Sequence, residues 1–176
     1  RVRAEFATAP VPLKARYVPD TAHPEVAIAL RRTDNRQLQT LMFKDHRTLE
    51  SSDVITMPSY LAVTEHEDVL KRFLDMHEVK YQVVAQSTRV NAVANRFTPP
   101  RTLKEGATLI GSANKTLSLA AGDVLIDLSQ PEGRVALLLL DPRSISNVFR
   151  YPAYAPLLTK GREFFVYPVN GSLSQE

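Results

Sequence analysis

Histidine and cysteine are the side chains most able to hold a metal, so their spacing decides which metal chemistry is open to this chain. The chain has no cysteine, which excludes disulfides, thiolate zinc sites, iron–sulfur clusters and a cysteine nucleophile. None of its four histidines is followed by Glu three residues later or by His four residues later, the spacings of common zinc peptidases. We therefore expect solvated or singly hydrogen-bonded imidazoles at His23, His46, His66 and His77.

Nucleophilic and acid–base chemistry have no local motif either. No serine lies in a Gly-x-Ser-x-Gly elbow, although a triad assembled from residues far apart in the sequence stays open. The carboxylate pairs Glu65/Glu67 and Asp123/Asp127 have the right residue type for acid–base work, but structural roles at a helix start and on the outer side of a strand explain both. We predict no catalytic, cofactor-binding or metal-ligating residue in this chain.

Phosphate-binding loops are also missing. Gly106 and Gly111 do not form a glycine-rich turn before a helix, and Asn114-Lys115-Thr116 has suitable residue types in the wrong setting. Aromatic side chains gathered near the C-terminus either pack the core or an interface, or form a surface that stacks on sugars or peptides. These residues are Phe149, Tyr151, Tyr154, Phe164, Phe165 and Tyr167.

The N-terminal part reads as β structure. Apolar and polar residues alternate from Val11 to Tyr17, and weaker strand patterns run over 26–30 and 38–43 with turn residues between them. We expect residues 1–52 to form an antiparallel meander.

The next part, 53–169, combines strands with two helices. Thr64 and Glu67 resemble a capping box before an apolar stripe, which predicts a helix from Glu65 to His77. A strand expected at 79–85 would make a strand–helix–strand unit between parallel strands. Further strands are expected at 90–97, 108–110, 123–128 and 164–169, with a second helix from Pro131 to Asp141.

These patterns predict an α+β fold: an N-terminal antiparallel β portion followed by a mixed sheet with two packed helices. The chain is interpreted as a single domain, with 170–176 as a frayed tail. Its 22 basic and 19 acidic residues are dispersed, which does not favour a nucleic-acid partner. No apolar run is long enough to span a membrane. The start at Arg1, without Met or an apolar signal core, suggests a processed or excised piece.

Several short blocks in a fixed order resemble the region that follows the catalytic domain in large bacterial zinc carboxypeptidase-like proteins. The blocks are 12–17 (PLKARY), 29–32 (ALRR), 55–63 (ITMPSYLAV), 75–79 (DMHEV), 121–131 (AGDVLIDLSQP), 139–142 (LLDP) and 163–169 (EFFVYPV). The resemblance covers most of 12–169 and implies a parent protein that is a secreted or periplasmic zinc-dependent exopeptidase. The zinc-binding His-x-x-Glu, the later His and the general-base Glu of that family have no matching positions here, so zinc would belong to the catalytic part of the parent.

Two functions follow as expectations. In the first, the chain is a non-catalytic accessory domain whose partner is the catalytic domain or chain of the parent metallopeptidase, and it shapes access of a peptide substrate. In the second, it is an independent module that binds a glycan, a peptide or an envelope partner through the aromatic C-terminal region.

Overall fold

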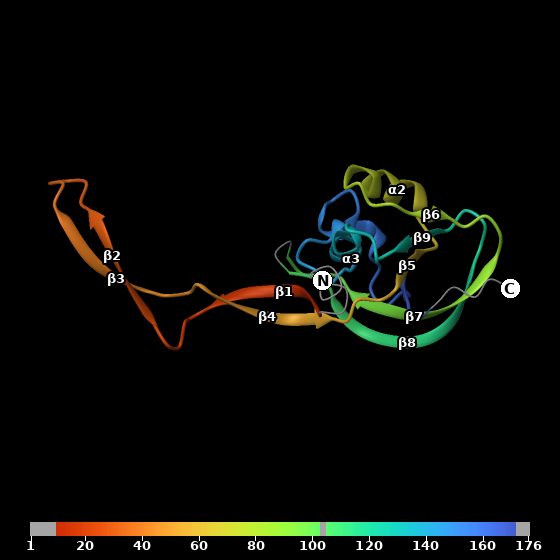
Figure 1. Cartoon of the computed structure of the whole chain (residues 1–176), viewed down its shortest axis with the longest axis horizontal. Coiled ribbons are helices and arrows are strands. Elements are labelled where there is room, and N and C mark those ends of the chain that lie inside the picture. The colour runs from red at the N-terminus through yellow and green to blue at the C-terminus, as the bar shows by residue number, and fades with distance from the viewer. Residues whose placement is uncertain (1–9, 103–104, 172–176) are drawn as a thin grey trace. The chain divides into compact units, whose positions relative to one another are not determined.

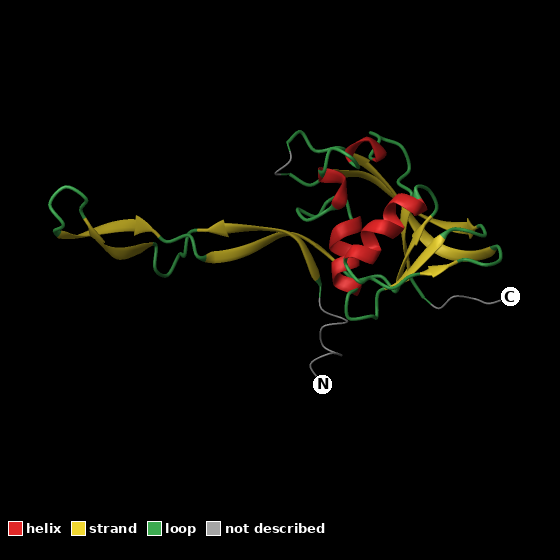
Figure 2. Ribbon diagram, turned by 90° about the horizontal axis from the view of Figure 1, so that it is seen from above, coloured by secondary structure: helices red, strands yellow, loops and turns green. Residues whose placement is uncertain are grey.

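The computed structural model describes residues 10–102 and 105–171, and the chain divides into two compact units. The smaller unit is 15–53, and the larger unit contains the described residues up to Lys14 and from Val54 onwards. Strands dominate and the two α-helices lie in the larger unit, which confirms the α+β class (Figures 1 and 2).

The larger unit is built on a six-stranded sheet in the order β6-β9-β5-β10-β7-β8. Its strands are β5 (Tyr60–Val63), β6 (Gln82–Val83), β7 (Thr88–Thr98), β8 (Thr108–Leu119), β9 (Val124–Asp127) and β10 (Val166–Val169). All the described pairings between neighbours are antiparallel, in contrast to the mixed sheet that we expected. The expected strand–helix–strand unit is present as β5, α2 and β6, but β9 inserts between the two parallel strands and pairs with both.

Both faces of this sheet bury apolar side chains. Helices α2 (Glu67–Met76) and α3 (Gly133–Leu140) contribute to the cluster on one face, where Leu70, Phe73 and Leu137 join Val63 and Ile126 from the sheet. The short 3-10 helices η1 (Val148–Arg150) and η2 (Ala155–Leu157) border the same cluster. The opposite cluster uses the alternate positions, including Ala62, Leu125 and Tyr167. This alternation explains why β9 reads as a clean strand in the sequence.

Three local expectations need correction. The residue that precedes the first turn of α2 is His66, at φ 62, and no side chain caps the helix, so the capping box of Thr64 and Glu67 does not form. The strand expected at 108–110 continues to Leu119 as β8, and each residue of 111–114 pairs with β7. Asp123 does not point outward: its side chain is buried, and Oδ2 accepts a hydrogen bond of 2.8 Å from the Ala120 N–H.

The strands before β5 pair as two separate ribbons. β1 (Val11–Val18) pairs with β4 (Thr48–Ile55), and β2 (Glu25–Arg31) pairs with β3 (Leu38–Lys44). A meander would pair β1 with β2, so the expected connectivity is wrong although the strands themselves are present. A tight turn joins β2 to β3, and across it the Arg32 N–H donates a hydrogen bond of 2.9 Å to the Gln37 carbonyl. This turn pairs β2 with β3, the next strand along the chain. Among the described residues, no helix is long and apolar enough to cross a membrane.

Candidate interaction surface

The hairpin of β2 and β3 has one apolar face. The register places Val26 opposite Phe43, Ile28 opposite Leu41 and Leu30 opposite Gln39. Because side chains of directly paired residues share a face and alternate along each strand, these pairs lie on one side of the ribbon. We call Val26, Ile28, Leu30, Leu41 and Phe43 the hairpin stripe.

The opposite face of the hairpin is more polar. It carries the pairs Glu25/Lys44, Ala27/Met42, Ala29/Thr40 and Arg31/Leu38. Two charged residues at one end and one at the other therefore border this face, whereas the hairpin stripe contains none. The opposite face also carries Met42 and Leu38, which are 58% and 69% exposed, so the two faces differ mainly in that only the hairpin stripe lacks charge.

Nothing in the smaller unit covers the hairpin stripe. Of residues 15–53, all of which the structure describes, only Asp45 is buried, so this unit has no apolar core of its own. Ile28 remains 40% exposed, Leu41 38% and Phe43 41%. A two-stranded ribbon is marginally stable alone in water, and contiguous exposed apolar residues mark binding surfaces. The hairpin stripe is the candidate interaction surface of this chain.

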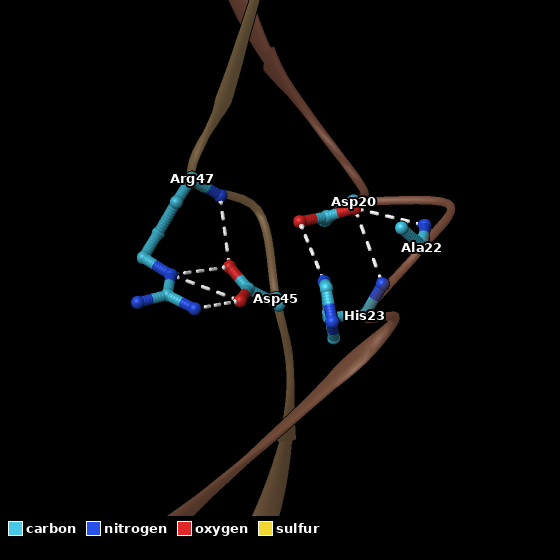
Figure 3. A network of polar contacts seen from close by, with 5 residues as sticks. All are labelled: Asp20, Ala22, His23, Asp45 and Arg47. Atoms are coloured by element: carbon cyan, nitrogen blue, oxygen red, sulfur yellow. Dashed lines mark hydrogen bonds and ion pairs between the residues drawn. The ribbon is translucent and has the colours of Figure 1, made fainter.

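A network of polar contacts organises the base of the hairpin (Figure 3). The Asp45 carboxylate accepts hydrogen bonds from the Arg47 backbone N–H at 3.1 Å and from the guanidinium of the same residue. Asp20 Oδ1 accepts bonds from the backbone N–H groups of Ala22 at 2.8 Å and of His23 at 3.2 Å. The Asp20 N–H in turn donates to the Asp45 carbonyl at 2.9 Å, which joins the two turns. The network fixes where the ribbon of β1 and β4 passes into the hairpin.

Hydrogen bonding sets the ionisation of both carboxylates. The Arg47 guanidinium, ahead of its backbone N–H, lowers the pKa of Asp45 below the ordinary value. The backbone N–H groups of Ala22 and His23 lower the pKa of Asp20. Both groups are therefore charged at neutral pH, and their charge is used to hold turns.

A second polar cluster lies in the larger unit. Glu163 Oε1 accepts hydrogen bonds from Lys115 Nζ at 2.6 Å and from the Tyr167 hydroxyl at 2.9 Å. Nearby, Arg162 Nη2 contacts Glu65 Oε2 at 3.0 Å. Lys115 and then Tyr167 lower the pKa of Glu163. Every charged member has an opposite partner, so this cluster ties β10 to β8. The hollow lined by Glu65, Arg162 and Glu163 is only about 10 Å³, whereas Lys115 also lines a shallow hollow of about 400 Å³.

One larger groove lies beside the start of β5 and the end of β9. Its volume is about 590 Å³, and its walls include Tyr60, Asp127, Gln130 and Arg134. Gln130 is held in place, because its side chain bonds both to the Lys80 N–H and to the Lys80 carbonyl at 2.8 Å. The groove offers apolar walls, charges of both signs and the hydroxyl-bearing residues Ser59 and Ser129.

The histidines are dispersed over the two units. His23 is exposed beside Asp20, and His46 is exposed next to the buried Asp45. His66 lies edge-on to Phe165 with the ring centroids 5.0 Å apart, and His77 packs against Phe73 at 4.7 Å. In the part of the chain that the structure describes, no three His, Asp or Glu side chains are grouped so that they could hold a metal ion.

The aromatic residues near the C-terminus mainly pack the interior. Phe149, Phe164, Phe165 and Tyr167 are buried, and Tyr154 packs partly against the core. Tyr151 alone of the six is largely exposed, at 58%. Of the two alternatives for these six residues, packing of the interior is therefore the one that the structure shows for most of them.

The sequence patterns did not single out the hairpin stripe or the Asp45–Arg47 network. The two weak strand patterns do not alternate, because all five residues of 26–30 are apolar and 41–43 is a continuous apolar run, so neither pattern marks one face. Nothing in the sequence marks Asp45, because an isolated Asp in a loop looks the same whether it is exposed or buried in a hydrogen-bonded network. No family model, curated protein or solved structure matches this chain.

Proposed function

We propose that this chain is a non-catalytic accessory module that binds another protein surface through the hairpin stripe. The single observation that carries the proposal is that five apolar side chains share one face of a ribbon whose unit has no core to cover them. Burial is worth roughly 25 cal/mol per Å² of apolar surface, so covering this face favours assembly.

The resemblance of the sequence to the region after the catalytic domain of zinc carboxypeptidase-like proteins suggests the setting of this module. In that setting the parent is a secreted or periplasmic metallopeptidase, the zinc ion belongs to its catalytic part, and the accessory module shapes how peptides reach the cleft.

The test uses the whole parent polypeptide with two matched pairs of substitutions. Ile28→Asp with Leu41→Asp places charge on the hairpin stripe, whereas Ala27→Asp with Met42→Asp places the same charge on the opposite face, one residue away on each strand. We expect the first pair to lower the thermal midpoint and to change the rate of hydrolysis of peptides with a free C-terminus. The second pair should change neither. Equal behaviour of the two variants would count against the proposal.

The groove beside Tyr60 favours a second candidate function, a module that binds a peptide or glycan. Its walls combine the aromatic ring of Tyr60 with the charged side chains of Asp127 and Arg134. Calorimetric titration of short peptides and oligosaccharides into wild type and Tyr60→Ala tests this candidate. Absence of heat with every ligand at millimolar concentration would remove it.

A further inference from the structure

We infer that a second copy of this chain covers the hairpin stripe. The two hairpins pack face to face and antiparallel, related by a two-fold axis at the Ile28–Leu41 pair. This inference rests on the proposed function, because it names the partner of the same surface. Two observations carry it: the order of side chains along the stripe and the distribution of charge along the hairpin.

The order of side chains makes the stripe self-complementary. Ile28 and Leu41 form its central pair, with Val26 and Phe43 towards the base and Leu30 and Gln39 towards the turn. A two-fold axis across the strands at the central pair stacks each central residue on its own copy. It also places Phe43 of one copy over Gln39 of the other, and Val26 over Leu30. Such an isologous contact uses the same surface on both copies, so the assembly stops at a dimer. The two hairpin faces would lie about 10 Å apart, the usual spacing of packed β structure.

Charge distribution selects the antiparallel arrangement. The turn end carries Arg31, Arg32 and Arg36 against the single carboxylate of Asp34, so it is positive. The base is negative in balance, because three carboxylates face two cations there: Asp20, Glu25 and Asp45 against Lys44 and Arg47. An antiparallel pair sets the positive turn of one copy beside the negative base of the other. A parallel pair would set like ends together.

The balance of charge also argues against a strongly charged partner. Residues 15–53 contain six Lys or Arg and six Asp or Glu. Arg32 contacts Asp34 at 2.6 Å and Arg16 contacts Glu50 at 2.8 Å, so charges of this unit are already paired within it. A second copy covers the stripe and sets opposite charges together, whereas a uniformly acidic partner such as a nucleic acid would meet the negative base as well as the positive turn.

The first experiment measures the mass of the chain in solution by light scattering and sedimentation from about 1 to 200 µM. Over this range of concentration a dimer of modest affinity changes from mostly monomer to mostly dimer. We expect wild type and Ala27→Asp/Met42→Asp to be dimeric at the upper end, and Ile28→Asp/Leu41→Asp to be monomeric. The circular dichroism of all three should coincide, because the larger unit holds the core. A monomeric wild type, or a dimer that survives Ile28→Asp/Leu41→Asp, would overturn the inference.

The second experiment reads the orientation. Because the chain has no cysteine, single cysteines can be joined by a bismaleimide without background. Mixing Phe43→Cys with Gln39→Cys should give far more crosslinked dimer than either variant alone, whereas a parallel pair would crosslink each variant to itself.

The outcomes also separate the inference from the proposed function. If the isolated chain is monomeric but the parent polypeptide still responds to Ile28→Asp/Leu41→Asp, another domain covers the stripe and only the second copy is excluded. If the chain is dimeric through the stripe but the parent's hydrolysis rate and thermal midpoint do not respond, the dimer stands and the accessory role fails.

Discussion

The hydroxyl of Tyr167 donates to Glu163 Oε1 at 2.9 Å, and the same oxygen accepts Lys115 Nζ at 2.6 Å. Burial first, and then the bond to Glu163, raise the pKa of Tyr167 to about 12. The relationship matters because Glu163 follows Arg162, which pairs with Glu65, so one short segment ties β10 to both β8 and the start of α2.

The first prediction concerns alkaline titration of tyrosine. Because the pKa of Tyr167 is raised in the folded state, the stability from this contact is complete below about pH 10 and is lost as the pH rises towards 12. Absorbance at alkaline pH should show the Tyr167 phenolate about two pH units after the ordinary ones. Burial also raises the pKa of Tyr81, so Tyr81→Phe serves as the background for the comparison. In that background Tyr167→Phe should remove the late step, and a late step that persists would contradict the assignment.

The second prediction concerns acid pH. Hydrogen bonds lower the pKa of Asp20 and Asp45, so their contribution is complete above the ordinary value of about 3.9 and is lost as the pH falls below it. Amide exchange at Ala22, His23 and Arg47 should therefore be slow and constant from about pH 5 to 8, after correction for intrinsic rates, and should accelerate sharply below about pH 4.

Asp45→Asn is the matched variant for this second prediction. It keeps the shape of the side chain but removes the charge that holds the Arg47 guanidinium, so protection at Arg47 should fall at neutral pH as well. Asp53→Asn in the same unit serves as a control. Protection that depends on pH between 5 and 8, or that is unchanged in Asp45→Asn, would show that the carboxylate does not organise the junction.

Strong periodicity located most elements, but the pairing of strands depends on information that is not local. The expected helix from Glu65 to His77 was accurate within two residues at the start and one at the end, because its apolar stripe has a single period. The insertion of β9 between β5 and β6 was missed, since nothing near either strand records which neighbour it will have. The pairing of β1 with β4 was missed because no strand was predicted over Thr48–Ile55.

The capping box shows why a correct motif can fail. Thr64 has the right spacing to Glu67, but its backbone N–H donates to the Phe165 carbonyl at 3.1 Å at the end of β5. Tertiary pairing therefore holds Thr64 with the sheet, and the chain enters α2 through the positive φ of His66. The candidate surface was missed for a related reason: weak patterns predicted strands at 26–30 and 38–43, but only the register shows which of their apolar residues share one face.

The third prediction tests the start of α3. A Cβ added at Gly133 would lie 2.0 Å from the Leu128 carbonyl oxygen, a backbone atom that cannot move aside cheaply. Gly133→Ala should therefore lower the free energy of unfolding by about 1 to 3 kcal/mol. Gly111→Ala is the control, because a Cβ there meets nothing within 4 Å. Equal midpoints in urea for the two variants would contradict the close approach of α3 to β9.

The fourth prediction tests the face that α2 buries. Phe73 is 9% exposed and contacts the rings of His77 and Tyr154, with centroids 4.7 and 5.9 Å away. Phe73→Ala should lower the free energy of unfolding by about 3 to 5 kcal/mol, because the surrounding helices relax only partly into the space that is left. Val69→Ala on the exposed side of the same helix should change it by less than about 0.5 kcal/mol. Urea titrations measure both variants, and they are directly comparable if the unfolding free energy depends on urea concentration with the same slope. A decrease of under about 1 kcal/mol in the free energy of unfolding for Phe73→Ala would mean that α2 presents a different face to the sheet.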